Sequence, residues 1–440
     1  MALIDVTPDL ANARDRRLII AARGVRAFAY GLMGVLLGVA LSQRGLTPLS
    51  IGAIITASLA GDFVGTYAIA LYADRWGRRL TLAILAGLMA LTGVVFGMVS
   101  DYPLLLAAGF FGTLGTSASE TAPFLPIEQA IMPQLVPPHR RTGVFARYNL
   151  VASFAGALGA LAAGLPDVLS HIGIGLSGGI RLVFGVYVLA ALVAAWLALR
   201  LSPAVEVSTA SGAGRTWGRT NRWRSRLTPE LGSSRSVVLG LAGLFSVDSL
   251  AGGLVVQSLV ALYLHLRFGI ALGPLGVLFF AANTLSALSF LAAAPLARRI
   301  GLLNTMVFTH LPSNLLLAAM TFAPVFPIAA GLLLARQLLS QMDVPTRQAY
   351  TMALVAPEER TAAASVTSLA RSAGSAVSPV ISGALLQGAL LTLGLPFLVA
   401  GAMKSVYDLT LWRFFRRVPF EEPPSDDGPL ELDSAGSPRP

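Results

Sequence analysis

The segment PIEQAIMPQLVPPHRRT, residues 126–142, returns later in the chain as PTRQAYTMALVAPEERT, residues 345–361. The two copies align without a gap, the second one starting 219 residues after the first. Chance similarity between apolar helices would match leucines and valines, whereas here prolines, glutamines and arginines also match in register. The sequence therefore predicts a chain made of two equivalent halves.

Glycines elsewhere extend this internal repeat over most of the chain. Upstream of the quoted segment the offset between equivalent residues is 224, and downstream it is 219. The matching glycines are Gly45, Gly52 and Gly77 with Gly269, Gly276 and Gly301, and Gly164 with Gly383. If each half holds an even number of membrane spans, the halves share one orientation and are related by an axis along the membrane normal.

The composition places both halves in a membrane. Of the 440 residues, 55% are hydrophobic and 12% are charged, which is about half of the roughly 25% charged residues in a soluble chain. A membrane-spanning helix needs about 20 mostly apolar residues. We predict an all-α integral membrane protein with twelve transmembrane helices in two six-helix repeats. The predicted spans lie at about residues 18–42, 49–72, 80–100, 103–129, 143–165, 181–202, 237–263, 271–296, 301–324, 326–347, 362–387 and 392–413.

The arginines give the predicted orientation and domain boundaries. They gather in the segments that face the cytoplasm if the N-terminus does, as the positive-inside rule requires. We therefore expect a multi-pass protein of the inner or plasma membrane with both termini cytoplasmic. The predicted divisions are a tail at 1–17, a first half at 18–202, a basic linker at 203–236, a second half at 237–413 and a disordered tail at 414–440. The linker is either a flexible connector or a regulatory or lipid-headgroup site.

Composition also excludes several classes of chemistry. The chain has no cysteine and only four scattered histidines, which excludes thiolate sites and disfavours a metal site. Its one lysine, Lys404, lies in no phosphate-binding loop. We therefore expect no enzyme activity, no cofactor and no metal. The net charge of +10 follows from membrane topology and does not indicate a nucleic-acid partner. The expected partners are a small-molecule substrate, protons and the lipid bilayer, and the chain is expected to be a monomer.

The loop after the second predicted span reads ALYADRWGRRL, residues 70–80. It resembles the signature G-x-L-A-D-R-x-G-R-R of the major facilitator superfamily, and a weaker copy, APLARRIGLL, lies at 294–303. The resemblance covers nearly the whole chain and implies that superfamily's fold, with secondary transport by alternating access. It also implies a gating role for Asp74, Arg75, Gly77, Arg78 and Arg79.

Two departures separate the chain from the standard drug/proton antiporters of that superfamily. The fourth span lacks the intramembrane arginine of many proton-coupled members, and the fifth span lacks the Gly-Pro of the antiporter signature. The resemblance therefore implies a fold and a class of activity without a substrate.

Ionisable residues inside the predicted spans are candidates for function, because inserting one costs a few kcal/mol. The resemblance implies that spans one, four, seven and ten line a central cavity. The candidates there for substrate or proton binding are Arg26, Glu120, Asp248, Arg336 and Asp343. Asp248 and Arg336 lie at similar depth, so we expect them to pair, with Asp248 as the proton-coupling carboxylate. The alternatives are a purely structural pair and, for Arg26, a side chain that snorkels to the headgroups.

Glu128 and Arg347 occupy equivalent positions of the repeat with opposite charge, near the inner ends of their spans. We assign both to gating. They either pair with each other across the halves as an inner gate, or they brace helix ends within their own halves. Pro126 and Pro345, also equivalent in the repeat, are expected to interrupt spans four and ten.

Other ionisable residues in the spans are given structural roles. Lys404 and Asp408 are one helical turn apart, which predicts a local pair. Asp62 and His310 lie on spans outside the expected cavity lining, and we expect them to form hydrogen bonds in the core.

These features predict a secondary active transporter of a small solute that works by alternating access and is coupled to protons. The resemblance favours export over import. The alternatives are a uniporter or importer of a charged small molecule, and a non-transporting membrane receptor of the same fold.

Overall fold

The computed structural model describes residues 8–115, 123–137, 140–206, 234–355 and 359–416. The predicted site residue Glu120 and most of the predicted linker lie outside these ranges. Within them the secondary structure is helical throughout, with no strand. The all-α prediction is therefore confirmed for the described part of the chain.

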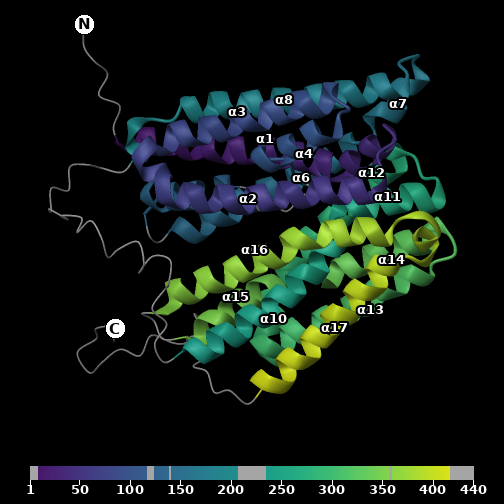
Figure 1. The fold of residues 1–440 in the computed structure, drawn as a ribbon. Helices are drawn as coiled ribbons and strands as arrows, with labels where there is room; N and C mark the ends of the chain where they lie inside the picture. The colour runs from purple at the N-terminus through teal and green to yellow at the C-terminus, as the bar shows by residue number, and fades with distance from the viewer. Residues whose placement is uncertain (1–7, 116–122, 138–139, 207–233, 356–358, 417–440) are drawn as a thin grey trace, which may run out of the picture.

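The helices form two groups that follow the order of the chain (Figure 1). The N-terminal group contains α1 (Pro8–Ser42), α2 (Pro48–Trp76), α3 (Arg78–Met98), α4 (Tyr102–Phe111), α5 (Phe124–Ile131), α6 (Arg141–Ala162), α7 (Leu165–His171) and α8 (Leu176–Leu199). The C-terminal group contains α10 (Arg235–Leu254), α11 (Gln257–Phe268), α12 (Leu272–Ile300), α13 (Leu302–Ala319), α14 (Phe326–Leu339), α15 (Asp343–Ala353), α16 (Arg360–Leu385) and α17 (Leu395–Phe415).

The helix surfaces fit a lipid environment. Seven helical stretches of the described residues are long and apolar enough to cross a membrane, the longest being Arg235–Phe268. Large apolar side chains point outward, among them Met98 at 80% and Leu291 at 73% exposure. Exposed apolar surface of this extent is costly in water and favourable in lipid. An integral membrane protein is therefore confirmed, while the count of twelve crossings stays a prediction.

The internal repeat of the sequence is also a repeat of structure. Gly77 joins α2 to α3 at φ 91°, and Gly301 joins α12 to α13 at φ 84°; these positive φ values favour glycine. The hydroxyl of Thr81 donates to the carbonyl of Gly77 at 2.8 Å, and that of Thr305 donates to Gly301 at 2.8 Å. Equivalent residues thus make equivalent contacts.

The two equivalent prolines lie just after breaks in the helices. Pro126 is the third residue of α5, and Pro345 is the third residue of α15. A proline in the first helical turn removes no intrahelical hydrogen bond. The breaks therefore precede the prolines: α4 ends at Phe111, and α14 ends at Leu339.

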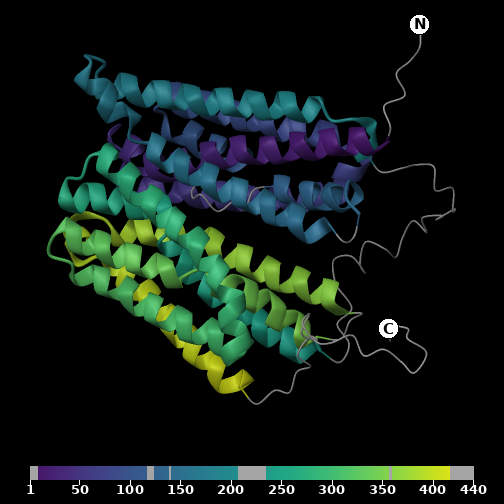
Figure 2. The same ribbon diagram turned by 180° about the vertical axis from the view of Figure 1, so that it is seen from behind.

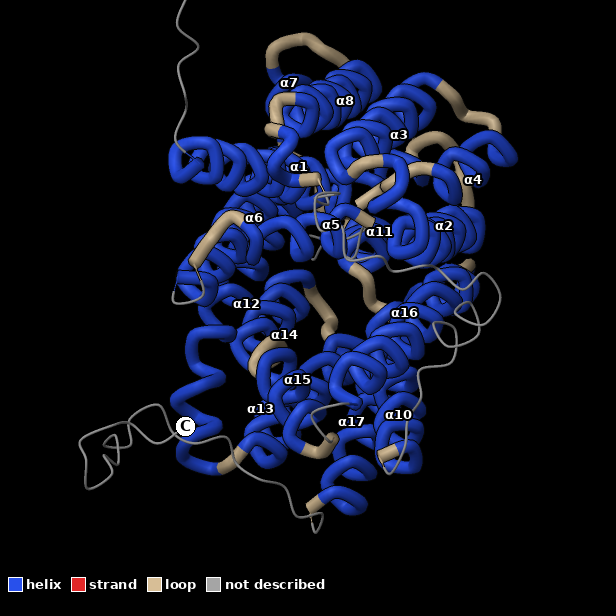
Figure 3. Tube along the Cα trace, turned by 90° about the vertical axis from the view of Figure 1, so that its left-hand side faces the viewer, coloured by secondary structure: helices blue, strands red, loops and turns tan. Residues whose placement is uncertain are grey.

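The two groups converge at one end of the molecule (Figures 1 and 2). We call the face where α1 begins and α17 ends the terminal face, and the face with the 43–47 turn the opposite face. Seen along the helices, α2 adjoins α16 on one flank and α6 adjoins α12 on the other (Figure 3). Residues 43–47 directly precede α2, so a contact at the start of that helix lies near the opposite face.

Backbone contacts place both flanks near the opposite face. A Cβ atom built on Gly52 of α2 would lie 2.4 Å from the carbonyl oxygen of Pro379 on α16. On the other flank, the backbone N–H of Gly273, at the start of α12, donates to the carboxylate of Asp167 on α7 at 2.6 Å. The N–H of Val380 on α16 donates to the hydroxyl of Thr56 on α2 at 3.0 Å. The ribbons of the two groups diverge from these contacts toward the terminal face (Figure 1).

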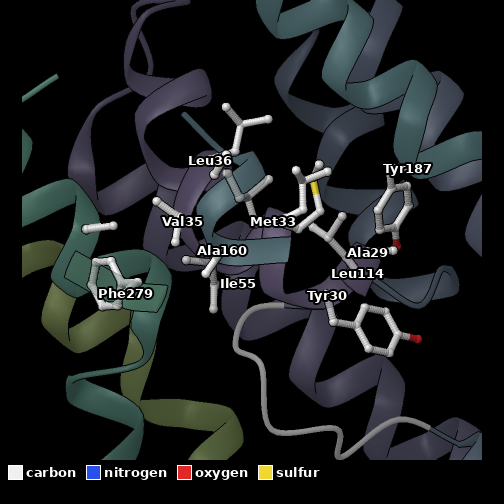
Figure 4. Packing of buried hydrophobic residues seen from close by; sticks show 14 of the residues in the cluster. Ala29, Tyr30, Met33, Val35, Leu36, Ile55, Leu114, Ala160, Tyr187 and Phe279 are labelled. Carbon is white, nitrogen blue, oxygen red and sulfur yellow. The ribbon is translucent and has the colours of Figure 1, made fainter. Parts of the chain in front are cut away.

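The core runs along α1, which contacts both groups. Met33 and Leu36 of α1 are fully buried. Figure 4 shows Tyr30 near Leu114 of the N-terminal group and Val35 toward Phe279 of the C-terminal group. This apolar packing holds α1 in place and so positions Arg26, which lies near the middle of the helix.

Candidate functional site

The first charged cluster lies inside the N-terminal group. One guanidinium nitrogen of Arg26 on α1 lies 2.8 Å from both carboxylate oxygens of Glu128 on α5. The hydroxyl of Tyr148 on α6 donates to the same carboxylate at 2.6 Å. The guanidinium of Arg26 also stacks 4.2 Å from the ring centre of Phe124. Since Arg26 and Glu128 are 2% and 1% exposed, this is a buried ion pair joining three helices, and Arg26 does not snorkel.

The second charged cluster lies inside the C-terminal group and centres on Asp248 of α10. Its carboxylate is 2.5 Å from the ammonium of Lys404 on α17, 3.5 Å from Arg347 on α15 and 3.8 Å from Arg371 on α16. Arg347 also pairs with Asp343, one turn earlier, at 2.6 Å. Three helices thus place cations around the one carboxylate of α10.

The expected pairing of Asp248 with Arg336 is not found. Among the described residues, Arg336 has no carboxylate within 4 Å; its nearest side-chain partner is the amide oxygen of Gln337 at 3.4 Å. Its Nε atom is buried without a hydrogen-bond partner. Arg336 is on α14, before the break, whereas Asp248 is contacted by α15, which follows the break. Because the helix is interrupted, α14 and α15 have different neighbours. A pairing inferred from equal depth along one continuous helix does not take this into account.

The predicted local pair of Lys404 and Asp408 is wrong. Lys404 faces Asp248, while Asp408 accepts hydrogen bonds from His310 and Asn314 of α13 at 2.9 and 2.8 Å. Asp408 is completely buried and His310 is 4% exposed. Helix α17 therefore uses one turn to contact α10 and the next to contact α13. His310 has the core hydrogen bond expected of it.

Asp62 of α2 is a buried carboxylate outside both clusters. It is 8% exposed, and its Oδ1 atom has no hydrogen-bond partner among the described residues. The hydroxyl of Tyr30 on α1 is likewise buried without a partner. The core hydrogen bond expected of Asp62 is therefore not found at Oδ1.

The loop of the predicted gate is joined to the chain that follows α8. The carboxylate of Glu206 accepts hydrogen bonds from the backbone N–H groups of Arg78 at 2.7 Å and Arg79 at 3.1 Å. These are the first two residues of α3, where a carboxylate satisfies free N–H groups and interacts favourably with the helix dipole. The side chains of Asp74 and Arg75 lie outside the described part of the structure. Glu206 therefore caps α3 directly after Gly77.

Glu128 and Arg347 each find partners within their own group. Arg26 and Tyr148 surround Glu128, and Asp343 and Asp248 surround Arg347. In this conformation the arrangement is that of two braces, one in each group. The braces have opposite polarity, because the α5 position carries the anion and the equivalent α15 position carries the cation.

Sequence reasoning missed Tyr148, Arg371 and Glu206 as members of these clusters. Arg371 carried a signal, because it is an ionisable residue in the middle of an apolar span. It lies on the eleventh predicted span, outside the lining of spans one, four, seven and ten that the resemblance implies. Tyr148 carried no such signal, since tyrosine is common in apolar helices. Glu206 carried none either, since carboxylates are common in the segments between helices.

Sequence comparison links the chain to membrane transporters. The family model described as Major Facilitator Superfamily matches residues 19–342. The chain is 28% identical over 420 residues to Uncharacterized membrane protein YJR124C of Saccharomyces cerevisiae, covering 91% of this chain and 93% of that one.

Structure comparison finds the same fold in solved transporters. A bacterial homologue of the human lysosomal transporter Spinster, in an inward-facing and unoccupied conformation, matches with a TM-score of 0.70 and 15% identity, covering 93% of this chain and 99% of that one. A mutant of the nucleoside transporter NupG matches with a TM-score of 0.70 and 14% identity, covering 91% of this chain and 100% of that one. A bacterial homologue of the iron transporter ferroportin, in an inward-facing state, matches with a TM-score of 0.66 and 16% identity, covering 91% of this chain and 98% of that one. At these identities the likeness shows the fold.

Proposed function

Because the chain belongs to the Major Facilitator Superfamily, we propose that it carries a small solute across the membrane by alternating access, coupled to protons. Membership makes the chain a membrane transporter and not an enzyme. Substrate, coupling and direction belong to the proposal. The observation that carries it is that each helix group has its own buried ion-pair cluster, while the groups contact each other near one face.

This arrangement suits rocking of one group against the other. An ion pair that stays within its group can remain intact while the groups move, whereas contacts between the groups must break and form. The Asp167–Gly273 and Thr56–Val380 hydrogen bonds are contacts of the second kind. With the termini proposed to be cytoplasmic, the terminal face is the inner face and the conformation is inward-facing.

The gate residues have a defined place in this proposal. Gly77, Arg78 and Arg79 join α2 to α3 under the cap of Glu206, and the loop is proposed to act as a latch between conformations. Asp74→Asn is expected to reduce transport severely while the protein still inserts into the membrane. Normal turnover in that variant would remove the latch from the proposal.

Proton coupling is proposed to act through Asp248. Its carboxylate is shared by Lys404, Arg347 and Arg371, so binding a proton would weaken its attraction for all three cations, while Arg347 would keep its pair with Asp343. Proton binding is favoured when another anion takes over one of the cations, because the carboxylate then loses part of the stabilisation of its ionised form. Asp248 is thus the residue proposed to link protons to the solute.

Export is the proposed direction, on the basis of resemblance to the superfamily. Uptake of a charged solute is the second candidate, and it is favoured by the cations that surround Asp248 in the C-terminal group. Both candidates use the same helices and the same clusters. They differ in the sign of the coupling between proton flux and solute flux.

Reconstituted vesicles can test the proposal. Purified protein in proteoliposomes would be given a panel of solutes under an imposed pH gradient, with internal pH and internal solute measured together. Solute-dependent proton flux is expected, and its direction relative to the solute separates export from uptake. Solute movement without proton flux would contradict the coupling. If no solute of the panel moved and none stabilised the protein against heat, transport as the activity would lose its support.

A further inference from the structure

A buried histidine–aspartate pair joins α13 to α17. The Nδ1 atom of His310 lies 2.9 and 3.1 Å from the two carboxylate oxygens of Asp408, and the side-chain amide of Asn314 donates to the same carboxylate at 2.8 Å. Asp408 is completely buried, and His310 is 4% exposed. Because Nδ1 must carry a hydrogen to donate to the carboxylate, Nε2 is the atom at which His310 can gain or lose a proton.

The charge balance of this pair depends on the proton at His310. A buried carboxylate without a counter-charge is costly. Among the described residues, His310 is the only side chain in an ion pair with Asp408. The protonated imidazole therefore balances Asp408, whereas the neutral imidazole leaves the carboxylate without a counter-charge.

Another cation, Lys404, lies one turn before Asp408 on α17. Its ammonium is 2.5 Å from the carboxylate of Asp248 on α10. Residues four apart on a helix are close enough to pair, although a lysine that precedes its acid is in the less favourable order. Asp248 also has Arg347 at 3.5 Å and Arg371 at 3.8 Å. If Lys404 left Asp248, two cations would therefore remain beside that carboxylate.

We propose that His310 is a second proton-binding site and that its proton decides which carboxylate Lys404 pairs with. With the proton bound, the charge of Asp408 is balanced, and Lys404 stays on Asp248 as in the present conformation. When Nε2 of His310 gives up its proton, Asp408 attracts Lys404 from one turn away. The local pair of Lys404 and Asp408, absent from this conformation, then forms. This inference rests on the proposed proton coupling and adds a site on α13 to it.

The surroundings of His310 leave α17 as its link to the charged cluster. The ring of Tyr407 on α17 lies 6.3 Å from the imidazole ring, and a tyrosine hydroxyl stays neutral where an imidazole titrates. Helices α12, α14, α15 and α17 pack against α13. Within the described structure, no hydrogen bond or ion pair joins His310 to the remaining ionisable side chains of these helices. Besides Lys404, those side chains are Arg298, Arg299, Arg336, Asp343, Arg347, Tyr350 and Arg413.

Nuclear magnetic resonance can follow both groups in the intact protein. Lys404 is the only lysine of the chain, and there are four histidines. Protein made with isotope-labelled lysine and histidine and placed in lipid nanodiscs therefore gives one lysine side-chain signal and four imidazole signals. Raising the pH from about 5 to about 8 covers the range in which an imidazole loses its charge. We expect the signal of Lys404 to shift with the same midpoint as that of His310.

Two variants should hold the lysine signal at opposite ends of this shift. His310→Gln removes the titrating charge, so the signal should stay near its high-pH position, and the missing imidazole signal identifies His310. Asp408→Asn removes the competing carboxylate, so the signal of Lys404 should stay near its low-pH position. The matched control is His265→Gln, because the ring of His265 bonds to the carbonyl of Ile270 at 2.7 Å after the end of α11. This control should keep the native shift.

Several results would overturn the exchange. They are an imidazole of His310 that keeps one charge state throughout, a lysine signal that does not move while His310 titrates, and a native shift in Asp408→Asn. The last of these decides even if His310→Gln fails to fold. The measurement needs folded protein but no solute. Movement of Lys404 in a protein that transports nothing would refute the proposed function alone, and proton-coupled transport with a stationary lysine signal would refute the exchange alone.

Discussion

Gly52 of α2 lies directly against Gly383 of α16, because a Cβ atom built on Gly52 would be 3.1 Å from the Cα atom of Gly383. Their repeat equivalents, Gly276 of α12 and Gly164 between α6 and α7, lie against each other on the other flank. There a Cβ atom built on Gly276 would be 3.2 Å from the backbone nitrogen of Gly164. The same pair of glycines thus brings the two groups together twice.

Adding a methyl group at Gly52 should weaken this contact. Gly52→Ala places a Cβ atom 2.4 Å from the carbonyl oxygen of Pro379, so the helices must separate. We expect a shift away from the present conformation. The measurement is the reactivity of Ser258→Cys, which is fully buried where α11 meets α1, toward a thiol reagent; it should rise several-fold. Gly87→Ala is the control, since a Cβ atom on Gly87 meets nothing within 4 Å. Equal reactivity in both variants would contradict a role for the glycine contact.

The Arg26–Glu128 pair should be sensitive to single changes and tolerant of exchange. Glu128→Gln breaks the buried ion pair with Arg26, which costs about 3–5 kcal/mol and should lower the thermal unfolding temperature of the purified protein. The exchange Arg26→Glu with Glu128→Arg should recover part of this loss. Combining Glu128→Arg with Arg347→Glu should not, because the two residues have separate partners here. Rescue by that second combination would indicate a cross-group gate in another conformation.

The repeat and its consequences could be predicted from the sequence because they depend on residues that are equivalent along the chain. The offset of 219 places Pro126 and Pro345 at the third residue of α5 and α15, and the same offset makes Glu128 and Arg347 equivalent. Partner choice could not be predicted in this way. Lys404 has an acid one turn away, yet it contacts Asp248.

The reason is that helix packing decides which neighbour a side chain meets. Two residues one turn apart on α17 lie near each other, but α10 and α13 both pack against α17 and offer better-placed partners. The break between α14 and α15 had a similar effect on Arg336. Sequence spacing describes one helix at a time, whereas these clusters involve three or four helices.

Removing the negative charge at Asp248 should destabilise the protein, because the buried cations near it lose a counter-charge. Asp248→Asn leaves Lys404 buried and unpaired, with an expected loss of about 3–5 kcal/mol in thermal unfolding. Adding Lys404→Met removes that cation and should restore much of the stability. If Asp248 couples protons, Asp248→Asn should abolish gradient-driven accumulation of the solute, and the double variant should not recover it. Downhill exchange should persist in both variants. Full pH-driven accumulation in the double variant would place coupling at another group.

The Glu206 cap should matter for transport beyond its effect on stability. Glu206→Gln removes the negative charge that interacts with the N-terminal N–H groups of α3, at a cost of about 0.3–1 kcal/mol. Asp101→Asn is a matched control, because Asp101 caps α4 by accepting from the N–H of Leu104 at 3.1 Å on the opposite face. We expect similar small losses of stability in both variants, but slower transport in Glu206→Gln alone. Equal transport rates would limit Glu206 to capping the helix.

The paired glycines have a consequence for how such a chain can change. Gly52 of the first half contacts Gly383 of the second half. Gly276, the repeat equivalent of Gly52, contacts Gly164, the repeat equivalent of Gly383. The same two surfaces therefore meet on both flanks, with the halves exchanged. This reciprocity is the mark of an isologous interface, the kind that joins two identical subunits around a twofold axis. The single chain therefore keeps the interface geometry of a homodimer of six-helix units. A substitution that suits one flank has to be matched by its counterpart on the other, or the axis between the halves will tilt.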